Sequence, residues 1–177
     1  TEQATREAAL ACELGYHAGL LGLGALAKAT EGEVLRHCRN VAEVLPVFGF
    51  YLQPQIVGRV LSYRFWRRLC EIETVVGIKV AVFDRYRTLD VVRAVAESGR
   101  LDIALYTGND DNIVLDLLTP FRFDVNDSTV ERCFVGGLLG HWAFWTHGAV
   151  RMFTDCQRIR ESSGTVHPDL LATANQV

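Results

Sequence analysis

The sequence is poor in the features that mark several large classes of protein. Its five cysteines are Cys12, Cys38, Cys70, Cys133 and Cys156. They include no CxxC pair and have no histidine at zinc-finger spacing, so neither structural zinc nor a disulfide framework is indicated. We expect all of them to be buried thiols in a reducing compartment.

Other absences narrow the function further. No uninterrupted apolar run reaches the roughly 18 residues that a helix needs to cross a bilayer, and no basic-then-apolar leader precedes the first predicted helix. The 18 basic and 21 acidic residues give a formal net charge of -3, which disfavours broad contact with nucleic acid or anionic lipid. No GxGxxG turn follows a predicted strand, so a dinucleotide site is disfavoured. We expect a cytoplasmic protein without metal or cofactor.

The pattern that is present is a regular alternation of helices and strands. The 177 residues are 49% hydrophobic and 22% charged, which is typical of a globular domain. Predicted strands start near residues 16, 47, 75, 102 and 131, so they recur about every 28 residues with helices between them. This period predicts βαβ units and a parallel sheet, either doubly wound or a (β/α)8 TIM barrel, in a single α/β domain over residues 1–177.

Local signals place several element boundaries. Thr30 and Glu33 form a capping box before a helix expected over residues 31–45, and Ser62 is expected to cap a later helix. Thr88 is expected to begin the helix after the third strand. Residues 131–139 are expected to form the last strand.

A lone lysine, Lys79, lies in the apolar, β-branched run at 73–83. Alternation along a strand places Lys79 on one face with Gly77 and Ala81. Burial there lowers the pKa of an amine and makes it a nucleophile. The alternative is a structural lysine whose stem lies on apolar surface while its charged end reaches water, and from this strand alone that alternative is favoured.

Polar residues follow several of the predicted strands. They are Tyr51 and Gln53, then Lys79, then Thr107, Gly108, Asn109 and Asp110, and finally His141. Each taken alone fits a structural role, such as a satisfied core tyrosine, a turn, a helix cap or a loop histidine. Because the carboxyl ends of parallel strands meet at one rim, their joint placement predicts a site there.

These residues resemble a known family. The segments Leu-Pro-Val-Phe-Gly-Phe-Tyr-Leu-Gln-Pro at 45–54 and Val-Gly-Ile-Lys at 76–79, with 28 residues from Tyr51 to Lys79, resemble the dihydrodipicolinate synthase / N-acetylneuraminate lyase family of class I aldolases. The Tyr-Thr-Gly-Asn-Asp run at 106–110 is similar to a turn of that family. Gln55, Ile56 and Val57 stand where the synthases carry an arginine, which disfavours the synthase reaction itself. The Gly-Gly-Leu-Leu-Gly-His-Trp run at 136–142 departs from the characterised members and indicates a divergent branch.

The resemblance implies a Schiff-base lyase or aldolase acting on a 2-oxo acid such as pyruvate. Lys79 would form the imine, Tyr51 would move protons, and Gly108 would let the substrate approach the backbone, with its neighbours at 107–110, Gln53 and His141 lining the site. The resemblance also implies that the chain covers about strands 4 to 8 of the barrel, without its N-terminal strands and C-terminal helices. Five βα units leave two sheet edges open, so either a missing part of the protein or another chain covers them, or the piece is not active alone. We expect a homo-oligomer.

Two other functions stay open at this stage. Lys79 could act as a simple charge partner for a carboxylate or phosphate in a binding protein, with no covalent chemistry. The same scaffold could also belong to a protein that senses a 2-oxo acid or assembles with others, since a fold does not fix a function.

Overall fold

A five-stranded parallel sheet forms the centre of this computed structural model, which describes residues 1–162 and 164–174 except for the side chain of His141. In spatial order its strands are β1 (Gly19–Leu21), β2 (Val47–Leu52), β3 (Val75–Ala81), β4 (Ala104–Thr107) and β7 (Gly136–Gly137). Every neighbouring pair is parallel, as predicted. Spatial order follows chain order without a reversal, which is the winding of a barrel and not of a doubly wound sheet.

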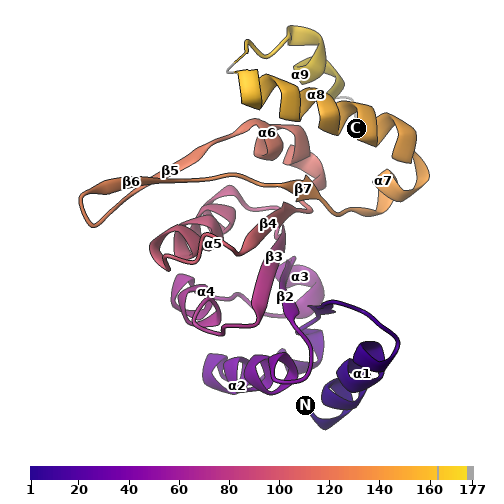
Figure 1. Ribbon diagram of the computed structural model, residues 1–177, viewed down its shortest axis with the longest axis vertical. Coiled ribbons are helices and arrows are strands. Elements are labelled where there is room, and N and C mark those ends of the chain that lie inside the picture. The colour runs from indigo at the N-terminus through magenta and orange to yellow at the C-terminus, as the bar shows by residue number, and fades with distance from the viewer. Residues whose placement is uncertain (163, 175–177) are drawn as a thin grey trace.

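The α-helices connect and cover these strands. They are α1 (Glu2–Glu13), α2 (Glu31–Ala42), α3 (Pro54–Val57), α4 (Tyr63–Leu69), α5 (Arg85–Glu97), α6 (Ile113–Leu118), α7 (Gly140–Phe144), α8 (Thr146–Ser162) and α9 (Pro168–Ala174). Short 3₁₀ turns lie at Gly24–Leu26 and Asp110–Asn112. Figure 1 shows α2, α4 and α5 in a row along one side of the sheet. We call the sheet face under these helices the outer face and the opposite one the inner face.

Capping side chains set where the helices begin. Thr30 and Glu33 form the expected capping box, and the Ser62 hydroxyl accepts a hydrogen bond from the backbone N–H of Phe65. The helix expected to begin at Thr88 instead begins at Arg85. Asp84 is its N-cap, because its carboxylate accepts the backbone N–H of Arg87 at 3.0 Å.

Alternation along β2 separates the two faces of the sheet. Val47, Gly49 and Tyr51 are buried, and Phe48 and Phe50 are half-buried. Leu69 and Trp66 of α4 pack so closely on Gly49 that a Cβ there would lie 2.9 Å from the Leu69 side chain. The odd-numbered residues of β2 therefore face the helices.

The inner face is lined by larger side chains that lie over glycines. The ring of Phe48 covers Gly77 so closely that a Cβ at residue 77 would overlap with it. Tyr106 of β4 packs edge-on against Phe48, with ring centroids 5.7 Å apart. Glycine at position 77 is thus required by the close approach of the ring.

The prediction of one strand over residues 131–139 is wrong. Residues 131 and 132 belong to an antiparallel hairpin of β5 (Phe121–Val125) and β6 (Ser128–Arg132). Of the predicted strand, only Gly136–Gly137 joins the main sheet, as β7. Asn126 and Asp127, both with positive φ, make the hairpin turn. Figure 1 shows this hairpin projecting past α5.

The expectation that all cysteines are buried is also wrong, because Cys12 on α1 is exposed.

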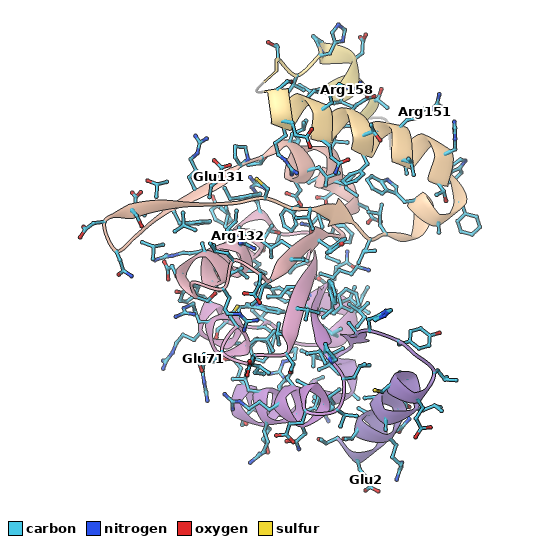
Figure 2. The ribbon with its side chains drawn as sticks, viewed as in Figure 1. Glu2, Glu71, Glu131, Arg132, Arg151 and Arg158 are labelled. Atoms are coloured by element: carbon cyan, nitrogen blue, oxygen red, sulfur yellow. The ribbon has the colours of Figure 1, made fainter. Side chains whose placement is uncertain are left out.

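Arginine side chains tie successive units together through backbone carbonyls. The guanidinium of Arg100 donates to the carbonyl oxygens of Cys70, Ile72, Glu73 and Val75 at 3.0–3.2 Å. Arg132, at the base of the hairpin (Figure 2), donates to the carbonyls of Leu101 and Ile103. These bonds fix the amino ends of β3 and β4 and dock the hairpin beside them.

Candidate functional site

Lys79 lies on the inner face near the carboxyl end of β3. In the sheet register it stands between Phe50 of β2 and Tyr106 of β4. Its ammonium nitrogen, Nζ, lies 4.6 Å from the centroid of the Phe50 ring, within cation–π range. The strand and the face predicted for Lys79 are those that the structure shows.

The segment after β4 passes directly over the lysine stem. A Cβ at Gly108 would lie 2.9 Å from Lys79 Cε and 3.0 Å from the carbonyl oxygen of Leu138. The N–H of Gly108 donates to the carbonyl of Val80 at 2.6 Å, which holds the two segments together. Gly108 is therefore a contact of Lys79, and its lack of a side chain leaves room for the lysine.

Two opposing effects set the charge state of Lys79. Partial burial lowers the pKa of its amine below the ordinary lysine value. The negative charge of Asp110 acts in the other direction and raises it, by less than burial lowers it. The net result is an amine that loses its proton more readily than a lysine in water.

Tyr51 lies on the outer face, away from Lys79. Its ring packs at 5.0 Å between centroids against Trp66 of α4, and the whole side chain is buried. Its hydroxyl donates to the carbonyl of Leu61 and accepts from the Leu61 N–H, both at 3.3 Å. The structure therefore does not bring Tyr51 and Lys79 together, and it is Phe50 that faces the lysine.

The residues of the turn at 107–110 divide between the two faces. Gly108 contacts the lysine stem and Asp110 acts on its charge, whereas Thr107 and Asn109 are buried on the outer side. Asn109 Oδ1 accepts the N–H of Phe83 at 3.0 Å. Phe83 has φ +50, a conformation that costs a non-glycine residue energy, so Asn109 stabilises a strained turn at the end of the lysine strand.

Asp116 of α6 is the centre of this outer network and was not singled out from the sequence. It is fully buried, and its carboxylate accepts hydrogen bonds from Thr107 (2.7 Å), Asn109 (2.9 Å), Asn112 (3.0 Å) and Arg85 (3.0 Å). Burial raises the pKa of this carboxyl, and the donors partly offset the rise. The signal in the sequence was a single carboxylate inside the apolar run Ile-Val-Leu-Asp-Leu-Leu.

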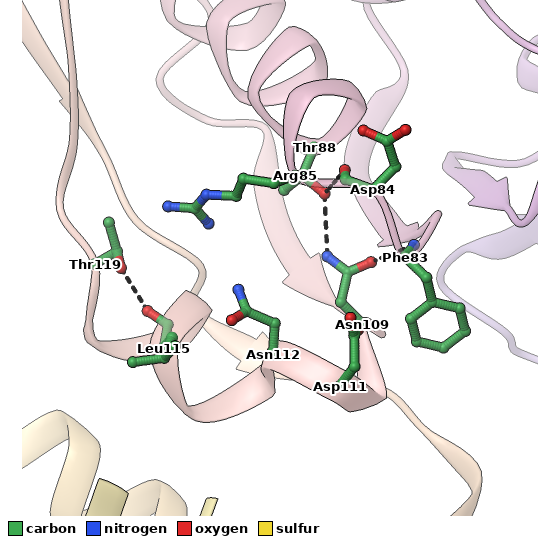
Figure 3. A pocket seen from close by; sticks show the side chains of 9 residues that line it. All are labelled: Phe83, Asp84, Arg85, Thr88, Asn109, Asp111, Asn112, Leu115 and Thr119. Atoms are coloured by element: carbon green, nitrogen blue, oxygen red, sulfur yellow. Dashed lines mark hydrogen bonds between the residues drawn. The ribbon is translucent and has the colours of Figure 1, made fainter. Parts of the chain in front are cut away.

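A polar cavity of about 400 Å³ opens beside this network on the outer side. Figure 3 shows Asn109 between Phe83 and Thr88, with the Arg85 side chain extending along the cavity. Because the buried polar groups Thr88 and Asn109 at this cavity already bond to one another, we interpret the cavity as the edge of a structural network.

The remaining predicted site residues are less informative. Gln53 is the half-buried N-cap residue of α3, with no capping bond from its side chain. The side chain of His141 lies outside the described residues. Arg59, the arginine nearest to the Tyr51 motif, donates to the carbonyl of Leu26 at 2.7 Å and so supports a loop.

In the residues that the structure describes, no group of three His, Cys, Asp or Glu side chains is arranged to hold a metal ion. Over the same ranges, none of the helices combines the length and the apolar character needed to span a membrane.

The sequence model of the Dihydrodipicolinate synthetase family matches residues 1–120, which include the Lys79 strand and the turn at 107–110. The chain belongs to this family. The resemblance stated from the residues is thereby confirmed. A comparison with curated protein sequences gives no significant match.

Solved structures show the fold of this dihydrodipicolinate synthetase family member. Dihydrodipicolinate synthase from Bacteroides thetaiotaomicron matches with a TM-score of 0.71 at 13% identity, over 97% of this chain and 51% of that chain. A variant of 2-keto-3-deoxygluconate aldolase from Sulfolobus solfataricus gives 0.64 at 16% identity, over 92% and 49%. The chain thus spans about half the length of these structures, and the predicted fold, part of a (β/α)8 barrel, is confirmed.

Proposed function

We propose that the full-length protein is a class I aldolase-type lyase that forms a Schiff base between Lys79 and a 2-oxo acid. The single observation that carries the proposal is the position of Lys79. Its partly desolvated amine lies on the inner face at the carboxyl end of a parallel strand, where barrel enzymes place reacting groups. Membership of the family and the aldolase name of a structural neighbour support the same reaction class.

The chemistry requires an amine that can lose its proton. Neutral Nζ attacks the ketone carbon of the 2-oxo acid, a C–N bond forms, and the carbonyl oxygen takes a proton to give a carbinolamine. A further proton transfer to the hydroxyl group lets it leave as water and gives a protonated imine. In the lyase direction, the hydroxyl group on the carbon beyond the breaking C–C bond loses its proton and that fragment leaves as an aldehyde, while the protonated imine takes the electron pair and becomes an enamine. Protonation of the enamine carbon and hydrolysis then release the shortened 2-oxo acid and return the free amine.

The proton transfers need groups on the same side of the sheet as Lys79. Tyr106 is a titratable residue that the strand register places beside Lys79, and Asp110 lies near enough for its charge to act on the amine. Tyr51, with its hydroxyl bonded to Leu61 on the outer face, is not positioned for the relay role that the resemblance implied. Gly108 keeps the path to the amine open.

Reductive trapping tests the proposal. The full-length protein is incubated with pyruvate and cyanoborohydride, and the adduct is located by mass spectrometry. The chain has two lysines, Lys79 and the exposed Lys28, so Lys28 reports non-specific labelling. We expect a saturable adduct at Lys79 that is lost in Lys79→Ala. No adduct at Lys79 across a panel of 2-oxo acids would refute the imine chemistry.

One observation favours a second candidate, in which Lys79 is a cationic binding residue for a carboxylate or phosphate. The Phe50 ring and the Asp110 charge both favour the ammonium form. Arginine keeps the charge but cannot form an imine. Ligand binding that survives in Lys79→Arg, together with no trapping in the wild type, would support this candidate.

Homo-oligomeric assembly and a cytoplasmic location stay predictions.

A further inference from the structure

The residue that faces Lys79 from the neighbouring strand is Phe50. The two are register partners between β2 and β3, and Lys79 Nζ lies 4.6 Å from the ring centroid. Phe50 is half-buried, so part of the ring and the amine share a partly desolvated environment. The neighbouring Tyr51 points to the opposite face, so alternation along β2 gives the lysine an aromatic face instead of a hydroxyl.

We propose that the ring of Phe50 stabilises the cation at Lys79, and above all the protonated imine, so that Phe50 is a catalytic residue of this site. The inference rests on the proposed function. The negative face of an aromatic ring attracts a cation without carrying a proton of its own. A protonated imine keeps its positive charge on the same nitrogen, so the ring that contacts the ammonium also contacts the reaction intermediate.

Asp110 also favours the cation, but through a full negative charge and not through an aromatic face. Asp110, from the segment after β4, supplies a negative charge, and Tyr106 of β4 is the titratable side chain in the same row of the sheet. The Tyr106 ring lies over Gly136, where an added Cβ would be 2.8 Å from it, and so leans toward β7. The face of Phe50 is the aromatic contact of Nζ that the described residues provide.

Phe50→Leu removes the ring and keeps an apolar side chain. Two quantities are measured on the full-length protein with pyruvate: the concentration that half-saturates trapping at Lys79, and the pH midpoint of the trapping rate. Above the pH midpoint, where the free amine is neutral and makes no cation–π contact, we expect the half-saturating concentration to rise roughly tenfold, because only the protonated imine loses the contact. We expect the pH midpoint to move down, because the ammonium form loses the same contact.

Matched variants separate this role from packing. Phe48→Leu removes an aromatic ring from the same face of the same strand, but that ring covers Gly77 and not the amine. We expect it to leave both quantities at wild-type values, and Phe50→Tyr to keep them as well. Phe50→Met serves as a second non-aromatic variant if Phe50→Leu does not fold.

The outcomes are distinguishable. An adduct in the wild type with unchanged values in Phe50→Leu or Phe50→Met overturns the role of Phe50 and leaves the proposed function standing. Equal changes in Phe48→Leu also overturn it, because they would reflect general loss of packing. Absence of any Lys79 adduct in the wild type overturns the proposed function, and the role of Phe50 with it.

Discussion

At the residue scale, the charge state of Lys79 decides when it can react. Because burial lowers the pKa of its amine, half of the folded molecules carry a neutral Lys79 at a pH below about 10.4, the pKa of a free lysine. Between the lowered pKa of the folded protein and the free-lysine pKa of the unfolded chain, the unfolded state binds more protons than the folded state. The free energy of unfolding therefore rises with pH across that window. We expect acetic anhydride labelling of Lys79, followed by mass spectrometry, to show a midpoint below pH 10.4.

Asp110 provides the control for this midpoint. Its charge raises the pKa of Lys79, so Asp110→Asn is expected to move the labelling midpoint further down. Exposed Lys28 in the same chain reports reagent reactivity. A wild-type midpoint at or above the free-lysine value, or an upward shift in Asp110→Asn, would contradict the electrostatic description.

Gly108→Ala tests how closely the turn after β4 controls the lysine. The new Cβ would lie 2.9 Å from Lys79 Cε and 3.0 Å from a backbone oxygen, and the backbone cannot move away as a flexible side chain can. We expect the rate of reductive trapping at Lys79 to fall at least tenfold.

Gly148→Ala on α8 is the matched control, because nothing lies within 4 Å of its Cβ position. We expect it to keep the wild-type trapping rate and to favour the helix slightly. If both glycine variants trap pyruvate like the wild type, the contact with Gly108 does not position the amine.

Single residues also show how far the sequence could predict the site. The strand and the face of Lys79 were predictable, because period-2 alternation fixes the face that each side chain of a strand takes. From the strand alone a structural lysine was favoured, and the reaction at Lys79 stays a prediction. Tyr51 was assigned from its spacing of 28 residues to Lys79, and that spacing does not report which face a side chain takes. A shift of one residue along β2 places Phe50 instead of Tyr51 beside Lys79 on the inner face. The register between β2 and β3, which decides this, is visible only in the structure.

At the element scale, the buried carboxylate of Asp116 joins α6 to the turns after β3 and β4. Asp116→Asn would place an amide N–H₂ among the donors that now bond to the carboxylate, and would remove the partner of Arg85. We expect the free energy of unfolding to fall by about 2–4 kcal/mol, measured by urea denaturation.

The same substitution at a nearby exposed position gives the comparison. Asp111→Asn lies in the 3₁₀ turn before α6, and we expect it to change stability by less than about 0.5 kcal/mol. Similar effects of the two substitutions would mean that the network around Asp116 contributes no more than a surface carboxylate.

Elements with strong local signals were predicted well, and those defined by tertiary contacts were not. Capping at Thr30 and Ser62 was visible in the sequence because a cap is made within four residues. The hairpin of β5 and β6 was missed although Phe121, Phe123 and Val125 alternate with polar residues along β5. Its strands are short and partly exposed, and they pack on α5 instead of joining the main sheet. The two-residue strand β7 is defined by its hydrogen bonds to β4, which no local pattern reports.

At the scale of the whole molecule, the parallel α/β architecture followed from the strand period of about 28 residues, and the family from motifs that this period places at one rim. The long-range ties between units could not be predicted, because an arginine that bridges two turns has the same sequence signature as one in solvent. Three arginines each donate hydrogen bonds to the backbone carbonyls of at least two other residues: Arg100, Arg132 and Arg160.

Arg100 tests whether such ties stabilise the fold. Its planar guanidinium reaches the carbonyls of Cys70, Ile72, Glu73 and Val75 together, and the point charge of a lysine cannot bond to all four. We expect Arg100→Lys to lower the free energy of unfolding by about 2 kcal/mol, seen as a lower urea midpoint with an unchanged slope.

Arg158→Lys supplies the matched control for that change. Arg158 pairs with Asp155 one helical turn earlier, and both side chains are largely exposed, so the same substitution should cost less than about 0.5 kcal/mol. A fall of equal size in the two variants would show that loss of a guanidinium anywhere has this effect. A fall confined to Arg100→Lys would show that the hydrogen bonds of Arg100 at the amino end of β3 stabilise the sheet. They would then also stabilise the strand that carries Lys79.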